Sequence, residues 1–248
     1  MSLGKVVWAS AQALKANWAK AQATFFLFLC LAAPAFAEPA EKDGTTALHW
    51  AAYHDDAKAV ETLLAAGAKA EVPNRYGITP ILLACENGNE TIVRALLAAG
   101  ADPHAKRRGG ETALMIASRT GRPGAVKALL EAGAEVDSKD RTGQTALMWA
   151  AAQGHAEVIE LLVNAGADVK HRLDSGFTAF LFAAREGKTA AVEKLLALGA
   201  DVNDAIVTDK ETRGRDAPNG TGAVIFAVEN GHFELAMKLI RAGADPND

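Results

Sequence analysis

A 33-residue period is the feature that most constrains this chain. A Gly-x-Thr turn places threonine at Thr46, Thr79, Thr112, Thr145 and Thr178, each one period after the one before it. A Gly-Ala pair keeps the same period, at Gly67, Gly100, Gly133, Gly166 and Gly199. One unit of this length is too small to bury its own apolar face, so it is stable only when neighbours stack on it. The period therefore predicts a single elongated repeat domain.

The period is interrupted once, near the C-terminus. Gly243 follows Gly199, and Gly222 follows Thr178, each eleven positions later than the period requires, so eleven residues are inserted before the last repeat. The insertion falls within residues 204–218, whose centre is too polar to add to the apolar stack. Long loops of this kind are either functional or mobile. We expect a flexible finger, with an ordered recognition loop as the alternative.

Each unit reads as a turn followed by two short helices, as the fourth unit illustrates. Residues 140–143 have turn chemistry, and the hydroxyl of Thr145 is suited to accept hydrogen bonds at a helix start. Residues 147–151 predict a short helix with a small inner face, and the apolar spacing of 158–162 predicts a second, amphipathic helix. Gly166 then suits the left-handed position at the end of that helix.

These motifs together resemble the ankyrin repeat. They are Thr-Ala-Leu-x-x-Ala-Ala, Gly-His, a Leu-Leu pair and Gly-Ala-Asp-Val, and the resemblance covers residues 41–248. It implies an all-α repeat solenoid of six ankyrin repeats with hairpin tips, whose concave surface binds other proteins without catalysis. The signature proline and histidine of the family each remain once, as Pro80 and His49.

Several positions depart from the repeat pattern. One row carries large apolar residues that we interpret as core filling: Trp50, Leu83, Ile116, Trp149, Phe182 and Phe226. Pro123 falls where a second helix should start, so that helix is expected to begin late. His155 and His232 occupy the Gly-His turn, where we expect them to cap helices.

The first 37 residues are typical of a secretory signal peptide. A basic, alanine-rich stretch precedes a short apolar run at 25–33, and a small-x-small site ends at Ala37, the predicted cleavage position. A retained membrane anchor is the alternative, but the run is far below the ~20 residues that a spanning helix needs. The chain thus resembles exported bacterial ankyrin-repeat proteins, which places residues 38–248 in the periplasm or outside the cell, with no membrane contact after cleavage.

Composition and motifs exclude several function classes. The mature part has 23 basic and 30 acidic side chains, a net charge of −7, which disfavours general nucleic-acid binding. No Cys-x-x-Cys, His-x-x-x-His or Gly-x-Ser-x-Gly motif occurs, so the sequence predicts no metal, no cofactor and no enzyme activity. Cys85, the one cysteine after the signal, is expected to be a small buried hydrophobe.

The residues that are not expected to pack in the core are the candidates for partner binding. Arginine recurs at one register of the hairpin tips, and Lys106, Lys139 and Arg172 precede it, which predicts a basic groove for an acidic protein segment. The predicted partner-binding residues are Arg75, Tyr76, Ile78, Arg108, Glu111, Arg119, Arg141, Gln144, Phe177 and Arg185. Tyr76, Ile78 and Phe177 are the apolar anchors. The alternative is a solvated charged rim.

The two ends of the stack differ. Asp55 and Asp56 make the first repeat more polar, whereas the last repeat keeps an apolar second helix with Leu235, Leu239 and Ile240. We therefore expect a monomer unless the last face pairs with a partner. The sequence favours an exported adaptor, and the alternative is the scaffold portion of a larger exported protein whose activity lies outside this chain.

Overall fold

The computed structural model describes residues 41–208 and 218–246. Residues 38–248 form one compact unit. The predicted signal peptide, residues 1–37, and the centre of the predicted insertion, residues 209–217, lie outside the described residues.

The described residues form helices joined by turns and hairpins, as the sequence predicts. The first helix of each pair is α2 (Ala47–Tyr53), α4 (Pro80–Asn87), α6 (Ala113–Thr120), α8 (Ala146–Gln153), α10 (Ala179–Arg185) or α12 (Ala223–Glu229). The second is α3 (Ala57–Ala65), α5 (Glu90–Ala98), α7 (Pro123–Glu131), α9 (Ala156–Asn164), α11 (Thr189–Ala197) or α13 (Phe233–Arg241). In these residues β structure is limited to isolated bridges such as Lys106 with Thr112. No helix in this part of the chain has the length and apolarity to cross a membrane.

The helix ends follow the local sequence. The hydroxyls of Thr112, Thr145 and Thr178 each accept a hydrogen bond from the amide three residues later, which confirms the capping role predicted for Thr145. At the other end of the pair, Gly166 has φ +99, and the following amide, that of Ala167, donates to the Leu162 carbonyl. This arrangement is a Schellman motif, which satisfies carbonyl groups that the last helical turn leaves unpaired.

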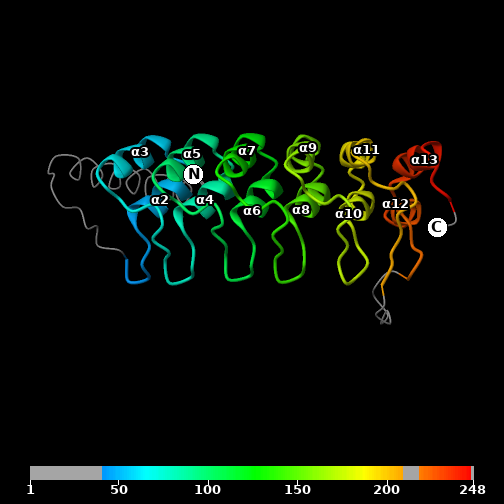
Figure 1. The fold of residues 1–248 in the computed structure, drawn as a ribbon, viewed down its shortest axis with the longest axis horizontal. Coiled ribbons are helices and arrows are strands. Elements are labelled where there is room, and N and C mark those ends of the chain that lie inside the picture. Colours follow the sequence, from blue (N-terminus) through cyan, green and yellow to red (C-terminus); the bar gives the residue numbers. More distant parts are fainter. Residues whose placement is uncertain (1–40, 209–217, 247–248) are drawn as a thin grey trace, which may run out of the picture. The chain divides into compact units, whose positions relative to one another are not determined.

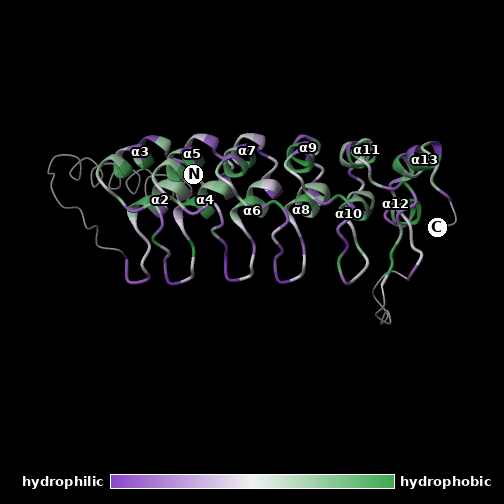
Figure 2. Ribbon diagram, in the orientation of Figure 1, coloured by the Kyte–Doolittle hydropathy of each residue, from purple (hydrophilic) through white to green (hydrophobic). Residues whose placement is uncertain are grey.

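The helix pairs stack side by side in two rows, with all finger-like hairpins on one side (Figure 1). Small residues permit the close approach of the first helices: Ala150, Ala151, Ala183 and Ala184 are fully buried. Larger aliphatic side chains fill the space between the rows. Figure 2 shows that hydrophobic residues gather in the helices while the turns of the hairpins are mostly hydrophilic. One continuous core therefore runs along the described repeats, as expected of stacked units.

Three local expectations are wrong. Helix α7 begins at Pro123, one full period after the start of α5, because proline at the first helical position costs no hydrogen bond. His155 and His232 lie at the N-caps of α9 and α13 without capping them; Nε2 of His155 donates instead to the Arg119 carbonyl, 3.0 Å away, at the end of α6. The side chain of Trp50 is 41% exposed, so it fills no core.

The two ends of the stack differ, but Leu235 and Leu239, which the sequence suggested for the last face, are buried, and only Ile240 of that set is exposed. Asp55 takes the place of a turn glycine with φ +60 and accepts a hydrogen bond from the side chain of Asn89, while Asp56 caps α3. In the last pair the side chains of Val228, Phe233 and Met237 are exposed. These three residues leave an apolar surface on α12 and α13 that no other described repeat covers.

Candidate functional site

The hairpin tips present a regular row of positive charges. We call finger loops the hairpins that lead into each first helix, residues 41–45, 68–78, 101–111 and 134–144 for the first four; they project from one side of the stack (Figure 1). Lys42, Arg75, Arg108 and Arg141 occupy the same position in these loops, one period apart, and all four are exposed. We call these four residues the cation row. The fifth residue of the same register is Asp174.

Hydrogen bonds join successive finger tips. The Arg75 amide donates to the Asp43 carbonyl (2.7 Å), and the Arg141 amide donates to the Gly109 carbonyl (3.2 Å). Between them, the Arg108 guanidinium donates to the Arg75 carbonyl. Each tip is therefore tied to its neighbour, by backbone hydrogen bonds between the first and second and the third and fourth tips, and by the Arg108 side chain between the second and third.

The close approach of the third and fourth tips explains why residue 110 is a glycine. A Cβ at Gly110 would lie 3.2 Å from the Cα of Asp140 and 3.3 Å from the Arg141 amide nitrogen, and Gly110 has φ +83. A side chain here would push the third and fourth tips apart, and the backbone conformation itself disfavours one. Glycine at this position thus sets the spacing of Arg108 and Arg141.

The cation row keeps its charge available. Among the described residues, no ion pair includes Lys42, Arg75, Arg108 or Arg141. Arg75 donates to the hydroxyl of Tyr76 and lies over its ring, 4.8 Å from the centroid, and the hydroxyl raises the pKa of Arg75.

Three acids lie in the same turns and reduce the local charge, namely Glu41 and Asp43 at the first tip and Asp140 at the fourth. Hydrogen bonds from Thr45, and to a lesser degree the nearby Arg75, lower the pKa of Asp43, so this carboxylate is ionised at neutral pH. The four cations of the row exceed these three acids by one, and the exposed Lys106 and Lys139 beside the row add to its positive charge.

Arginines closer to the helices are neutralised by acids, so fewer residues of the predicted basic groove keep a free positive charge. Arg107 pairs with Glu86 and with Glu111 (3.3 Å), and Arg119 also pairs with Glu111 (3.0 Å). The Arg119 guanidinium lies 5.5 Å from the centroid of Trp149. Glu111 and Arg119, both predicted to bind a partner, are thus engaged in one intramolecular network.

The fifth finger has its arginine turned inward. Arg172 pairs with Asp204 and donates to the carbonyls of Gly176 (2.6 Å) and Ala205 (2.7 Å). The hydroxyl of Thr178 donates to the second oxygen of Asp204 (2.5 Å). This cluster fastens the base of the long loop before α12 to the preceding repeat.

An aromatic cluster lies beside that anchor. Phe177 is 5.0 Å from Phe182 and 5.2 Å from Phe226, centroid to centroid. The Arg185 guanidinium lies 5.0 Å from the ring centroid of Phe177, and it pairs with Glu186 at 3.0 Å. Phe177 and Arg185 are therefore held against their own chain, far along the repeats from the predicted anchors at the second finger.

Of the remaining predicted residues, some lie at the finger tips and others in the stems, the parts of the finger loops next to the helices. Tyr76 is 49% exposed at the second tip. Ile78 and Gln144 are half-buried in the stems: the Ile78 carbonyl accepts a hydrogen bond from His49 (2.9 Å), and the Gln144 amide donates to Asp140 (3.0 Å). The structure thus gathers at the tips Arg75, Tyr76, Arg108 and Arg141.

Sequence reasoning missed an exposed aromatic cluster on α2. Trp50 packs edge-on against Tyr53 and stacks on His54, and Tyr53 is 56% exposed. The Trp50 indole donates to Glu41 (3.2 Å), next to the first cation of the row. The sequence feature that could have predicted this exposure is the place of Trp50 in the first repeat, since no preceding repeat in the described chain covers it.

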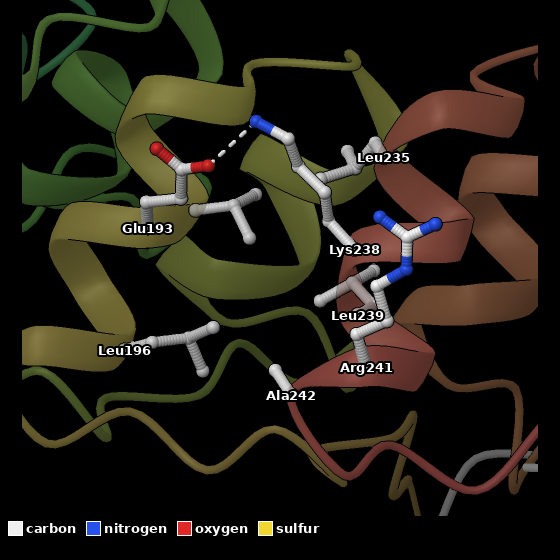
Figure 3. Close-up of a pocket in the computed structure, with 8 residues that line it drawn as sticks. Glu193, Leu196, Leu235, Lys238, Leu239, Arg241 and Ala242 are labelled. Atoms are coloured by element: carbon white, nitrogen blue, oxygen red, sulfur yellow. Dashed lines mark hydrogen bonds and ion pairs between the residues drawn. The ribbon is translucent and has the colours of Figure 1, made fainter.

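A shallow cavity of about 360 Å³ opens between α11 and α13, away from the fingers (Figure 3). Leu196, Leu235 and Leu239 line it, and an ion pair between Glu193 and Lys238 (2.7 Å) spans it. Arg241 also lines the cavity. None of the predicted partner-binding residues lines this cavity.

The described residues offer few groups suited to catalysis or metal binding. They contain no group of three or more His, Cys, Asp or Glu side chains that could hold a metal ion. Cys85 is fully buried, and burial raises the pKa of its thiol to about 12. This confirms Cys85 as a small buried hydrophobe, because a protonated thiol is a poor nucleophile.

Comparison with known proteins identifies the repeat. A family model described as ankyrin repeats (3 copies) matches residues 16–107, 66–140 and 114–206. The human ASB11 ankyrin repeat domain is similar in structure, with TM-score 0.68, 25% identity, and coverage of 80% of this chain and 84% of that one. The ankyrin repeat domain of Bcl-3, a member of the IkappaB family, gives TM-score 0.66, 29% identity, and coverage of 84% and 92%.

Among curated proteins, no sequence matches the chain significantly. The family model nevertheless spans most of the chain, and the stacked helix pairs with finger loops agree with it. The chain belongs to the ankyrin repeat family.

Proposed function

We propose that this ankyrin repeat protein is an adaptor that holds an acidic segment of another protein along its finger tips. Ankyrin repeat domains are protein-binding scaffolds. The observation that supports an acidic partner is that some arginines are paired with acids of the chain and others are not. Some are neutralised within the chain, namely Arg107, Arg119, Arg172 and Arg185, whereas Arg75, Arg108 and Arg141 at the tips have no acidic partner among the described residues.

The physical chemistry of the tips suits reversible binding of an acidic chain. An exposed ion pair contributes only about 0.2–1 kcal/mol, so a useful affinity requires several that act together. The cation row supplies four, and Lys106 and Lys139 are exposed beside it. Arg and Tyr are also the residue types most often decisive at interfaces, and Tyr76 stands beside Arg75.

We infer that the adaptor acts without catalysis, as ankyrin repeat proteins generally do. Binding alone requires complementary charge and shape, which the tips provide. A catalytic site would require a nucleophile or an activated acid or base, and the buried thiol of Cys85 is not accessible for that role.

We also propose that the protein is exported, because its first 37 residues are typical of a signal peptide. Cleavage after Ala37 would leave the repeat domain to meet its partner in the periplasm or outside the cell. Cell fractionation and N-terminal sequencing of the mature chain test this: Glu38 is the expected first residue. Recovery of the intact chain from the cytoplasm would contradict export.

Affinity capture tests the binding function. The full chain and the variant Arg108→Glu/Arg141→Glu are used as baits with a periplasmic extract, and Lys58→Glu/Lys127→Glu, which reverses two exposed cations on α3 and α7, is the control with the same change of charge. We expect the first variant to lose a partner that the parent chain and the control retain. Equal recovery by all three baits would refute the acidic-segment proposal.

The exposed apolar face of α12 and α13 favours a second candidate, a scaffold portion of a larger exported protein. Val228 stands where Ala184 and Ala151 are fully buried by the next repeat, yet it is 46% exposed. Light scattering of the full chain tests whether this face pairs. A monomer agrees with the adaptor, and a self-associated form that Phe233→Ser/Met237→Ser dissolves would show that this face pairs.

A further inference from the structure

We propose that the cation row recognises an acidic segment in the polyproline II conformation, with a carboxylate at every third residue. This inference rests on the proposed function and adds the spacing and conformation of the partner. It begins from the fact that the row has one cation per repeat, fixed by the repeat period at Lys42, Arg75, Arg108 and Arg141.

The stacking of helices sets the distance between successive cations. Packed helices lie about 8–10 Å apart, and each finger follows its own helix pair, so the tips repeat at about that distance. The tip-to-tip hydrogen bonds of Arg75 and Arg141 hold the backbone at this spacing. The third and fourth tips also approach closely at Gly110, where a Cβ would lie 3.2 Å from the Cα of Asp140.

A polyproline II chain matches this distance. It rises about 3.1 Å per residue with three residues per turn, so every third side chain points the same way and recurs at about 9.3 Å. A β-strand fits less well, because side chains on one face recur at about 6.7 Å and then at about 13 Å. The geometry therefore favours carboxylates at positions i, i+3, i+6 and i+9.

An acidic helix could also present a carboxylate about every 10 Å, with one acid in seven residues. The charge of the partner argues for the extended form. Segments rich in acids and poor in large apolar residues do not fold alone, and polyproline II is a major conformer of such chains. A partner already in this conformation loses less freedom on binding.

The row also has a defined length. It spans four tips, since the fifth position of the register is Asp174 rather than a cation. The guanidinium of Arg172 in that finger faces inward to Asp204. Four carboxylates, and hence a segment of about ten residues, saturate the row.

Three synthetic peptides of equal net charge test the spacing with the full chain. The matched peptide repeats Asp-Pro-Ala four times; the second places four Asp at alternate positions; the third places four Glu seven residues apart in an alanine-rich helix. We expect the matched peptide to bind about tenfold more tightly than the others, with an affinity that falls as salt rises. Single Arg75→Ala, Arg108→Ala and Arg141→Ala variants should each lose about two- to fivefold, whereas Lys127→Ala should not.

A charge swap tests the register directly. In Arg108→Glu, the matched peptide should bind again when lysine replaces either its second or its third Asp, and only one of these two, because Arg108 is third from one end of the row and second from the other. The rescuing position also gives the direction of the bound segment. Rescue at neither position, or equally at all four, would overturn the register.

Other outcomes separate this inference from the function it rests on. If all three peptides bind equally and Arg108→Glu weakens each alike, the spacing is wrong while an acidic partner remains. If the helical peptide or a single-stranded DNA of equal charge binds most tightly, the extended acidic protein segment is wrong. If no peptide binds and Arg108→Glu/Arg141→Glu leaves capture unchanged, both proposals fail.

Discussion

The first four fingers and the fifth use their basic side chains for opposite purposes. In the first four, Lys42, Arg75, Arg108 and Arg141 stand at exposed tips without an ion pair in the described chain. In the fifth, the basic side chain is Arg172, and it is engaged inside the molecule. A basic residue at a repeat position therefore serves recognition or architecture according to the acid that reaches it.

The acid in question comes from the next repeat. Arg172 aligns with Lys106 and Lys139, which are exposed. Of these three residues, only Arg172 forms an ion pair with an aspartate of the following finger, Asp204. That finger carries the inserted residues, and its base must be fixed to the stack. The same repeat thus carries an anchored finger and fingers with free tips, and four experiments test this difference.

Asp204→Asn should have the largest effect, on stability. It leaves the half-buried Arg172 without its carboxylate and weakens the bond to Thr178, at a cost of about 2–3 kcal/mol in the free energy of unfolding. Urea unfolding measures the loss. Glu186→Gln, which breaks the exposed pair with Arg185, is the control and should change it by under about 0.5 kcal/mol. Equal losses would show that the Asp204 cluster is no anchor.

Gly110→Ala should both destabilise the chain and disturb the tips. Gly133→Ala is a matched control, since Gly133 also has a positive φ (+88) but has nothing within 4 Å of a new Cβ. Both substitutions should cost about 1–2 kcal/mol from the backbone conformation alone. Only Gly110→Ala should lose more than this and also weaken peptide binding, because it alone forces Asp140 away. Equal binding by both variants would contradict the fixed spacing.

Arg119→Ala and Arg108→Ala should separate stability from binding. Removing Arg119 takes one partner from Glu111 and the cation from the Trp149 ring, which should cost about 0.5–1 kcal/mol of stability. Removing Arg108 loses one exposed hydrogen bond to the Arg75 carbonyl, so it should lower the free energy of unfolding less than removing Arg119 does and should lower affinity instead. Calorimetry of both variants measures the two effects. The reverse assignment would show that the ion-paired arginines form the interface.

The smallest effect concerns pH and the first repeat. Burial lowers the pKa of His49 below its usual 6.5, partly opposed by its hydrogen bond to the Ile78 carbonyl. The folded state thus favours the neutral ring, so its contribution is present above about pH 6.5 and is lost as the pH falls below that value. Unfolding measured from pH 7.5 to 5 should show this slope, and His49→Leu should reduce it. An unchanged slope would mean that other groups cause it.

The sequence predicted the fold because the fold is local and repeated. The repeat period, the threonine caps and Gly166 each act within one unit, and stacking copies of that unit leaves little else to decide. The errors have the same origin. Trp50 belongs to a buried row by alignment, but it lies in the first described repeat and has no neighbour on one side. Position in the stack decides burial, and a pattern averaged over repeats does not contain it.

The candidate site was only partly predictable. The register of the tip arginines is visible in the sequence, but the acids that neutralise other arginines lie one repeat away in space. Glu111 reaches both Arg107 and Arg119, and Asp204 reaches Arg172 across 32 residues. Which cation remains free depends on side-chain reach across neighbouring repeats, and spacing along the chain does not reveal that.

The central claim is that the free tip cations, and not the ion-paired arginines, hold the partner. Two triple variants test it most directly, Arg75→Ala/Arg108→Ala/Arg141→Ala against Arg107→Ala/Arg119→Ala/Arg185→Ala, with equal loss of charge. Partner capture and melting temperature are measured for both. The account predicts that the first loses capture at an unchanged melting temperature, and that the second keeps capture and melts earlier. Capture lost only in the second, or equally in both, would contradict it.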